Sequence, residues 1–572
     1  MPVQNVEIAE LFDRMADLLE IEDANPFRVR AYRNAARMIG AYPHGMAELL
    51  EEGRDLDELP GIGKDLAAKI ATIVKTGHLP QLEQIEKRTP RALSELMKLP
   101  GLGPKRVKLL YRDLDIRSAE DLARAARSGR LGDLPGFGAK TVEKILGGLA
   151  RSLPGERRLK LADAEQIAAP LAAYLRKCPG VKSVDVAGSF RRRKDTVGDL
   201  DILVTCSVDS TVMAHFVDYD SVKEVLSKGD TRSSVRLRSG MQVDLRVVPE
   251  VSYGAALYYF TGSKSHNIAV RKMGMARKLK LNEYGVYRGE KRIAGRTERE
   301  VFHSVGLPYI EPELREDRGE IQAARRGRLP KLIVRTDLRG DLHSHTDATD
   351  GRDTLEEMAR AAQALGYEYL AITDHSKHVS VAHGMDRKRL ATQLKAIDAL
   401  NAKLKGFRLL KSMEVDILDD GSLDMPDEVL AELDLVVAAV HYKLDMPKTR
   451  QMTRILRAMD NRHLGILAHP SGRLINERNP MDLDMERVLR HAKATGCCLE
   501  VNAQPERLDL DDLHCKLAKE LGVRLTISSD AHSTDGLELI RHGVDQARRG
   551  WLEPDDVVNT LPLRKLLAVL KR

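Results

Sequence analysis

Residues 340–572 repeat one arrangement, a short apolar run that ends in a residue able to bind a metal ion. Short apolar runs alternating with helical segments are typical of parallel strands joined by crossover helices. In barrels of such strands, functional residues gather at the C-terminal strand ends. A lone histidine after a strand is usually a packing or capping residue, but six separate segments end in this way. They predict one convergent metal site, built from His343, His345, Asp350, His375, Glu414, His441, His469, Asp530 and His532.

The donor set of this predicted site restricts both the metal and the reaction. Imidazole with carboxylate suits Zn²⁺, Mn²⁺ or Fe²⁺ better than Mg²⁺, and Glu414 could bridge two ions. Clustered metal ions produce hydroxide near neutral pH and neutralise the charge of a phosphate. Hydrolysis of a phosphate ester is therefore the reaction that this segment suggests.

Near the N-terminus, three segments share a Leu-Pro-Gly-x-Gly frame: LPGIGKDLAAKI at 59–70, LPGLGPKRVKLL at 99–110 and LPGFGAKTVEKI at 134–145. Glycine permits a positive φ and removes side-chain bulk, so the amides at the following helix start can approach a phosphate. This is the helix-hairpin-helix pattern, which holds the DNA backbone without reading its sequence. One such turn is weak evidence, but three copies predict nucleic-acid binding through Gly61, Gly63, Gly101, Gly103, Gly136 and Gly138.

Two segments with alternating polar and apolar residues carry acids. GDLDILV contains Asp199 and Asp201, which share one face of a strand because strand side chains alternate, and QVDLRVV contains Asp244. Three carboxylates gathered on one sheet would repel one another unless a divalent cation lay between them. Oxygen ligands suit Mg²⁺, and a pair of such ions can activate an attacking hydroxyl and stabilise the leaving oxygen. Taken alone, such acids are more often surface groups or salt-bridge partners.

The segment AGSFRRRKDTV stands immediately before the first two acids. Gly188 and Ser189 can offer backbone and hydroxyl donors to a triphosphate, and Arg192 can offer a bidentate fork. The alternative for residues 191–194 is a solvated run of charge.

The palm-like region resembles the nucleotidyltransferase core of family X DNA polymerases through four segments that occur in the same order: GSFRR, VGDLD, VDLR and YFTGSKSHN at 259–267. The resemblance covers about residues 1–315. It implies that Asp199, Asp201 and Asp244 hold two catalytic Mg²⁺ ions, and that Asp244 helps activate the primer 3′-hydroxyl. The resemblance implies nucleotide-binding roles for seven further residues. Ser189, Arg192 and Gly198 would hold the triphosphate, Tyr259 and Phe260 would lie against the sugar, and Asn267 and Arg271 would contact the incoming nucleotide and the template side.

The N-terminal segment NPFRVRAYRNAARMI resembles the small lyase domain of the same family, which places its Schiff-base lysine at Lys69. An amine nucleophile needs a lowered pKa and basic neighbours, and Arg28 and Tyr32 fit such a pocket. Asp65 and Gln81 stand where the animal enzyme has lysines, which weakens the phosphate pocket. The alternative for Lys69 is a simple phosphate contact.

The segment 340–572 resembles the PHP (polymerase and histidinol phosphatase) domain, a distorted α/β barrel with a three-metal site, and all nine ligand positions of that family are filled. Thr349 stands where Ser is common. The whole chain resembles bacterial family X polymerases fused to a PHP domain. This implies a 3′→5′ exonuclease with up to three Mn²⁺ or Zn²⁺ ions, favoured by Mn²⁺, and in some relatives cleavage at abasic sites.

We therefore expect a multidomain polymerase that fills short gaps in base-excision repair. Its fold class would be an α-helical helix-hairpin-helix N-terminal region, an α+β palm and thumb, and a C-terminal TIM-like PHP barrel. The expected boundaries are a lyase-like domain over 1–90, a fingers-like domain over 91–150, the palm over 151–250, the thumb over 251–315, a linker over 316–338 and the PHP domain over 339–572.

Composition limits the partners and the setting. The net charge of +7 is compatible with a polyanionic partner, and the five cysteines form no CxxC pair, which argues against a zinc ribbon. No apolar run reaches membrane-spanning length, and the N-terminus lacks a secretory pattern. We expect a cytoplasmic bacterial monomer that binds gapped or primed DNA and deoxynucleoside triphosphates, with no membrane contact.

Two other readings remain open. In one, the chain is chiefly a DNA-binding scaffold whose PHP domain is structural. In the other, the barrel is a small-molecule phosphatase joined to a polymerase, although the covalent link to a DNA-binding region argues against it. The metal content of the purified protein tests the first alternative, because a scaffold need not retain several transition-metal ions. Activity on a phosphomonoester but not on DNA 3′ ends would favour the second.

Overall fold

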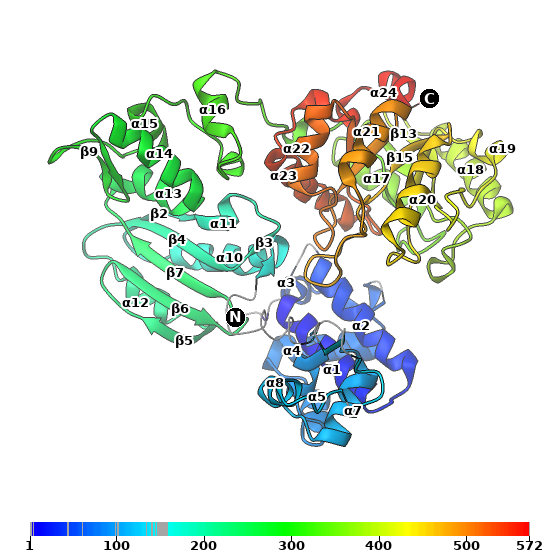
Figure 1. Cartoon of the computed structure of the whole chain (residues 1–572), viewed down its shortest axis with the longest axis horizontal. Coiled ribbons are helices and arrows are strands. Elements are labelled where there is room, and N and C mark those ends of the chain that lie inside the picture. The colour runs from blue at the N-terminus through cyan, green and yellow to red at the C-terminus, as the bar shows by residue number, and fades with distance from the viewer. Residues whose placement is uncertain are drawn as a thin grey trace.

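The computed structural model describes residues 3–570, apart from 4, 43–44, 60, 98, 100–101, 133, 139–140, 143–144 and 146–157. Figure 1 shows three lobes: a helical N-terminal lobe in blue, a mixed lobe in teal and green, and a C-terminal barrel in yellow-green to red. The barrel lies beside the mixed lobe and above the helical one.

The N-terminal lobe is a bundle of short helices around one apolar core. Phe12 and Tyr32 meet edge to face in that core, with ring centroids 5.4 Å apart, and join the first two helices. Glycines precede the helices of the first two repeats, because Gly63 caps α4 and Gly103 caps α7. The helices are α1 (Asn5–Ile21), α2 (Pro26–Ala41), α3 (Met46–Glu51), α4 (Lys64–Thr76), α5 (Pro80–Glu86), α6 (Ala92–Met97), α7 (Pro104–Leu114) and α8 (Ala119–Arg127).

The first part of the mixed lobe, which we call the palm, is a five-stranded sheet in the order β2-β4-β7-β6-β5. Strands β4 and β7 run parallel at its centre, and the other pairs are antiparallel. Leu200, Ile202 and Val204, which alternate with the acids along β4, are fully buried. The palm elements are β1 (Leu159–Lys160), α10 (Leu161–Arg176), β2 (Val181–Val186), α11 (Gly188–Arg191), β3 (Thr196–Val197), β4 (Asp199–Cys206), α12 (Val212–Val217), β5 (Val222–Ser227), β6 (Arg232–Leu237) and β7 (Gln242–Val247).

The second part of the mixed lobe is helical with a small antiparallel sheet of order β10-β9-β8. The expected linker over 316–338 is more than a solvated connector, because it carries a helix and Glu320 is fully buried against His266, 2.7 Å from Nδ1. The elements are α13 (Tyr253–Thr261), α14 (Lys264–Ala276), β8 (Lys280–Asn282), β9 (Gly285–Arg288), β10 (Lys291–Ala294), α15 (Glu298–Ser304) and α16 (Glu320–Arg325).

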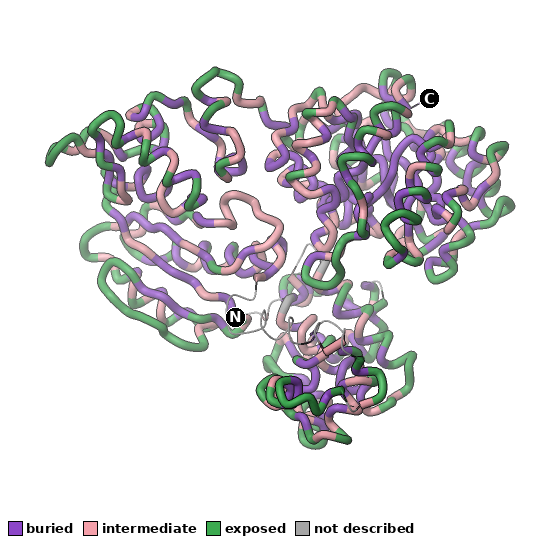
Figure 2. The backbone as a smooth tube through the Cα atoms, in the orientation of Figure 1, coloured by how far each residue is buried: buried purple, intermediate pink, exposed green. Residues whose placement is uncertain are grey.

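The C-terminal lobe is a seven-stranded parallel sheet in sequential order, β11 to β17. A parallel bridge between Ser344 and Ala531, just beyond the first and last strands, nearly closes it into a barrel. The strands are buried on both faces, as Figure 2 shows in purple, which agrees with their continuous apolar sequences. They are β11 (Gly340–Asp341), β12 (Tyr369–Ile372), β13 (Arg408–Asp416), β14 (Leu435–Ala439), β15 (Leu464–Leu467), β16 (Cys498–Asn502) and β17 (Leu525–Ser528).

Helices cover the outside of this barrel, as the parallel arrangement requires. Capping boxes and N-caps define their starts; for example, Thr354 and Glu357 close a capping box at the first of them. The helices are α17 (Leu355–Ala364), α18 (Arg387–Asn401), α19 (Asp427–Leu430), α20 (Lys448–Asp460), α21 (Met485–Thr495), α22 (Asp512–Leu521), α23 (Ile540–Arg549) and α24 (Leu563–Leu570).

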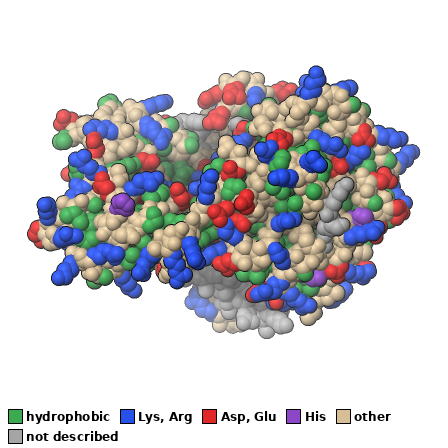
Figure 3. All heavy atoms as spheres, turned by 90° about the horizontal axis from the view of Figure 1, so that it is seen from above, with side chains coloured by type: hydrophobic (Ala, Val, Ile, Leu, Met, Phe, Trp, Pro, Cys, Tyr) green, Lys and Arg blue, Asp and Glu red, His purple; other side chains and the backbone are tan. Residues whose placement is uncertain are grey.

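The surface carries charge of both signs. On the face shown in Figure 3, Lys and Arg side chains spread over both lobes in view and alternate with acids, rather than forming one patch. Among the described residues, no helix is long and apolar enough to cross a membrane.

Candidate functional sites

The three palm acids lie on the two central strands. Asp201 on β4 is the direct register partner of Asp244 on β7, and Asp199 stands two residues earlier on the same face of β4. Asp244 is nearly buried and accepts bonds of 3.3 Å from Arg232 and from Gln242. The predicted gathering of these carboxylates on one face of the sheet is therefore what the strand pairing produces.

Burial and like charge act together on these carboxyls. Burial first, and then the charges of Asp199 and Asp244, raise the pKa of Asp201 to about 7. An acid in that position is stabilised in its ionised form by a cation between the three groups. The donor set of oxygens alone fits Mg²⁺.

A cavity of about 620 Å³ opens beside Asp199 and Asp201. Six of the seven predicted nucleotide-binding residues line it: Ser189, Arg192, Tyr259, Phe260, Asn267 and Arg271. Gly198 does not line the cavity, but a Cβ added there would lie 3.0 Å from the terminal nitrogen of Arg158, which does line it. Within the described residues, the Oγ of Ser189 is buried without a hydrogen-bond partner. An orphaned hydroxyl beside cationic groups is suited to an oxygen-rich ligand.

Sequence reasoning missed three basic residues of this cavity, Arg158, Lys194 and Lys264. Lys194 stands inside the quoted basic run and Lys264 inside the quoted segment 259–267, so a signal was present for both; Arg158 lies in no quoted motif. The alternative of a solvated run at 191–194 does not hold for Arg191, which forms bonds of 2.9 and 2.7 Å to the two carboxylate oxygens of Glu298.

The helix-hairpin-helix turns have the expected backbone. Gly61 and Gly136 adopt φ values of +68° and +86°, in the region that favours glycine. A Cβ atom added at Gly61, Gly63, Gly103 or Gly138 would have no atom of the described chain within 4 Å. A phosphate could therefore approach the backbone of these turns. Gly101 lies outside the described residues.

Lys69 is nearly buried on α4, and its amine lies 5.6 Å from the ring centre of Tyr32, the neighbour that the resemblance predicted. Its amine forms an ion pair with Asp65. A carboxylate at this point opposes the binding of a 5′-phosphate beside the amine, which is the departure noted in the sequence.

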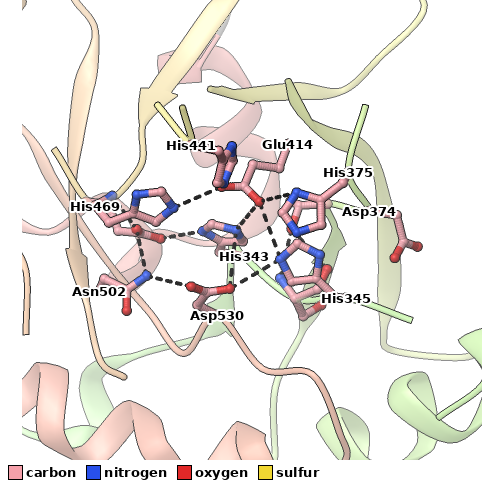
Figure 4. A network of polar contacts seen from close by, with 12 residues as sticks. His343, His345, Asp374, His375, Glu414, His441, His469, Asn502 and Asp530 are labelled. Atoms are coloured by element: carbon pink, nitrogen blue, oxygen red, sulfur yellow. Dashed lines mark hydrogen bonds and ion pairs between the residues drawn. The ribbon is translucent and has the colours of Figure 1, made fainter. Parts of the chain in front are cut away.

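In the barrel, all nine predicted ligands converge at the C-terminal ends of the strands. Glu414, at the end of β13, lies at the centre: its carboxylate is 2.9 Å from His375, 3.3 Å from His441 and 3.0 Å from His469. Figure 4 shows the imidazole rings pointing toward it and toward Asp530.

This site contains three overlapping groups of potential ligands, and within each group the ligand atoms lie within 4.8 Å of one another. The first group shares His345 with the second and His375 with the third, which is the arrangement that several adjacent ions would need. The three groups are His345, Asp350, His375 and His532; His343, His345 and Asp530; and His375, Glu414 and His441. Within the described residues, the three palm carboxylates do not form such a group, so their oxygens are spread more widely.

Carboxylates behind the ligands orient the rings, and the sequence analysis did not identify them. Glu500 on β16 lies 2.7 Å from Nδ1 of His343, and Asp416 lies 3.1 Å from Nδ1 of His441. Such contacts set the tautomer of a ligand and leave its other nitrogen toward the metal. A signal existed for Asp416, which follows Glu414 by two residues on the same strand face.

The charges in this site are mutually compensated. Burial by itself lowers the pKa of His375, but Glu414 and Asp350 outweigh it and raise that pKa to about 10. In the same way, Asp350 outweighs burial and raises the pKa of His532 to about 9. Burial and the neighbouring histidines lower the pKa of His345. Bound cations would replace the protons that otherwise balance the acids.

The residues present fit a multi-metal centre. Within the described part of the chain, both ring nitrogens of His345 and Nε2 of His343 are buried without a hydrogen bond. Buried imidazole nitrogens normally have partners, so the geometry leaves them for metal ions. The mixture of imidazole and carboxylate suits Mn²⁺ or Zn²⁺.

A second cavity, of about 440 Å³, gives access to this cluster. Its lining includes seven of the nine predicted metal ligands together with three arginines, Arg37, Arg478 and Arg507. Arg37 comes from helix α2 of the N-terminal lobe, and Tyr42 of that lobe donates a hydrogen bond to Asp535 of the barrel. The N-terminal lobe therefore contacts the barrel at the mouth of this cavity, through helix α2 and the residue that follows it.

Comparison with known families agrees with this architecture. Residues 3–79 match a helix-hairpin-helix domain, residues 93–151 a SAM-like helix-hairpin-helix tandem, residues 256–316 the DNA polymerase beta thumb, and residues 341–503 the PHP domain.

Comparison with individual proteins covers the whole chain. It is 38% identical over 571 residues to the DNA polymerase/3′-5′ exonuclease PolX of Bacillus subtilis (strain 168), which spans 99% of both chains. Over 233 residues the chain is 30% identical to a probable phosphatase of Thermoanaerobacter sp. (strain X514), a match that covers 38% of this chain and 89% of that protein. It is 35% identical to a probable phosphatase of Acetivibrio thermocellus, over 34% of this chain and 78% of that protein. The chain therefore belongs to the PolX family, the family X DNA polymerases that carry a PHP exonuclease domain.

Proposed function

We propose that this chain fills short gaps in DNA during base-excision repair and removes nucleotides from 3′ ends at its PHP site, with Mn²⁺ favoured for the second reaction. The observation that carries the proposal is the presence, in one chain of this family, of two separate sites of different donor chemistry. One is an acidic site beside a basic cavity, and the other is a histidine-rich site beside a second cavity.

In the palm, Mg²⁺ held by Asp199, Asp201 and Asp244 would activate the primer 3′-hydroxyl and stabilise the leaving pyrophosphate. Asp244, which pairs with Asp201 across the two strands, would help in that activation. These acids have to be ionised for this role, and cations bound between them would favour that state.

The cavity would bind the incoming nucleotide. Ser189 and Arg192, with the neighbouring Gly198, would hold the triphosphate, because a hydroxyl and a guanidinium offer hydrogen bonds to phosphate oxygens. The second set of residues would position the sugar, the base and the template: Tyr259, Phe260, Asn267 and Arg271.

The helix-hairpin-helix turns would hold gapped DNA by its phosphates, through backbone amides that approach at the glycines. Lys69 is the candidate for a lyase that removes a 5′-deoxyribose phosphate, and Tyr32 beside its amine supports this role. Lys69→Ala tests it: loss of deoxyribose-phosphate release supports the role, whereas unchanged release assigns Lys69 to phosphate contact or to structure.

In the barrel, up to three Mn²⁺ or Zn²⁺ ions held by the nine ligands would supply the nucleophile and neutralise the scissile phosphate. Glu500 and Asp416 would keep two of the histidine rings in position. The three arginines of the cavity would bind the phosphates of the strand that enters it. The same site could cut beside an abasic residue, because the reaction at phosphorus is the same.

The direct test is a primer assay on gapped DNA, with and without nucleotides, in Mg²⁺ and then in Mn²⁺. We expect extension of the primer when nucleotides are present, and shortening from the 3′ end without them that is faster in Mn²⁺. Purified protein that shows neither reaction but binds DNA would support the scaffold reading. Hydrolysis of a phosphomonoester without shortening of DNA would support the small-molecule phosphatase.

A further inference from the structure

The palm segment that lines the nucleotide cavity is held from outside by the barrel. We define the triphosphate loop as residues 188–195. Asp545 of helix α23 accepts two bonds from Arg193, at 2.8 Å from Nε and 2.5 Å from the terminal nitrogen. Arg549 of the same helix donates a bond of 2.7 Å to the backbone carbonyl of Arg192. Arg473 of the barrel lies 3.3 Å from the carboxylate of Asp195.

A second layer of contacts controls the side chain of Arg192, which lines the cavity. Its Nε donates to Glu316 at 3.0 Å, and Arg549 donates to the same oxygen at 3.2 Å. Arg549 also contacts Asp512 of α22 at 2.5 Å, and only 4% of Arg549 is exposed. The guanidinium of Arg549 therefore connects three groups: the backbone of the triphosphate loop, the carboxylate of Glu316 that orients Arg192, and Asp512 of the barrel.

The conformation of the loop indicates that it needs this support. Arg193 has a φ of +55°, which is uncommon for a residue other than glycine. Such a conformation persists where surrounding contacts impose it. Besides Asp545, the side chain of Arg193 contacts Glu165 on α10, so the turn is fixed between the palm and the barrel.

Helix α23 is a rigid support because it is closely seated on the barrel. A side chain added at Gly543 would come within 2.7 Å of Ile527 and 2.9 Å of Ala503, so the helix lies directly on strands β16 and β17. Asp530 and His532, two of the predicted metal ligands, precede α23 in the chain, with one short 3₁₀ helix, Asp535–Leu539, between them. The same helix thus adjoins one site and holds a loop of the other.

From these contacts we propose that the PHP domain positions the triphosphate loop, so that Asp545 and Arg549 determine how tightly the polymerase site binds a nucleoside triphosphate. The two are positioning residues: they act through Arg192 and Arg193 and do not touch the nucleotide. The proposal rests on the proposed function of the palm site.

The test compares full-length wild type with Asp545→Asn and Arg549→Met. Steady-state incorporation into gapped DNA gives KM and kcat, and calorimetry with dTTP and Mg²⁺ without DNA gives the Kd of the nucleotide. We expect Asp545→Asn and Arg549→Met to raise KM and Kd about tenfold, which corresponds to about 1.4 kcal/mol, with kcat within about twofold, as expected for loss of ground-state binding. Asp545→Glu, which keeps the charge, should recover part of the affinity.

Lys519→Met is the matched control. Lys519 forms the same kind of double ion pair, to Glu553 and Asp556, but within the barrel alone. It should leave KM and Kd unchanged. The 3′-end shortening activity of every variant reports whether the barrel is still folded; Asp545→Asn changes the fewest atoms and decides the question if Arg549→Met fails to fold.

Unchanged KM and Kd in Asp545→Asn would overturn the proposal while leaving the polymerase assignment intact. An equal loss of nucleotide affinity in Lys519→Met would also overturn it, because the effect would then come from general destabilisation. Absence of nucleotide binding by the wild type would instead reject the proposed palm function, and the positioning role with it.

Discussion

Glu298 provides the most quantitative prediction. This nearly buried residue on α15 forms two bonds to Arg191 of the palm and a third, of 2.6 Å, to the fully buried Arg315. Burial by itself raises the pKa of Glu298, but Arg315 and Arg191 outweigh it and lower the pKa from 4.5 to about 2. That lowering corresponds to about 3 kcal/mol of stabilisation at about 1.4 kcal/mol for each pKa unit.

Glu298→Gln should therefore lower the free energy of unfolding by about 3 kcal/mol at pH 7, since the amide mimics the protonated acid. Breaking a buried ion pair by removing one partner costs a similar about 3–5 kcal/mol. Urea denaturation followed by the fluorescence of Trp551 measures this loss, because the only tryptophan of the chain packs against the core that contains Ile310 and Leu314.

The pH dependence has a fixed sign. Because the folded pKa is depressed, the stabilisation is complete above the unfolded value of 4.5 and is lost as pH falls toward about 2. The difference between wild type and Glu298→Gln should shrink over that interval. Glu300→Gln on the same helix is the control, since its amide oxygen can still accept the backbone bonds from Gly295 and Arg296. Equal effects of the two substitutions at pH 7 would refute the reasoning.

Three further predictions concern the two sites and the DNA. Asp416→Asn should weaken Mn²⁺ binding about 10–100-fold, because this carboxylate orients His441; calorimetric titration with Mn²⁺ measures it, and unchanged affinity would remove Asp416 from the site. Gly103→Val should leave the fold intact, since a Cβ there meets no atom within 4 Å, but weaken DNA binding with the slope of log affinity against log salt unchanged, because the lost contact is a neutral backbone amide and no phosphate loses its cation; unchanged affinity at every salt concentration would exclude that turn. Chelation should lower the thermal midpoint, since bound ions stabilise the folded state by mass action; a midpoint unaffected by chelator and by added Mn²⁺ would contradict a metal centre.

Much of the barrel site could be predicted from the sequence for a simple physical reason. In a parallel barrel every strand ends at the same edge, so residues that follow apolar runs, such as His375 and His469, must meet there. The palm acids follow the same logic through strand alternation and the pairing of Asp201 with Asp244. Local pattern is sufficient when strand geometry alone decides which way a side chain points.

The contacts that were not predicted join distant parts of the chain. Arg193 and Asp545 are 352 residues apart, and Arg37 reaches the barrel cavity from the N-terminal lobe. Glu500 looks like one polar residue in an apolar strand until His343 is placed against it. Charged residues in the expected linker are buried by ion pairing, as with Glu320 and His266. Pairing of this kind depends on how the lobes dock, which no local pattern specifies.

Two chemically distinct metal sites are proposed to act separately in this one chain. The most direct measurement is extension and 3′-end shortening of the same gapped substrate by two double variants. Asp199→Ala with Asp201→Ala should abolish extension and keep shortening, and His343→Ala with His345→Ala should do the reverse. Loss of both reactions in either protein, with the fold preserved, would contradict the claim.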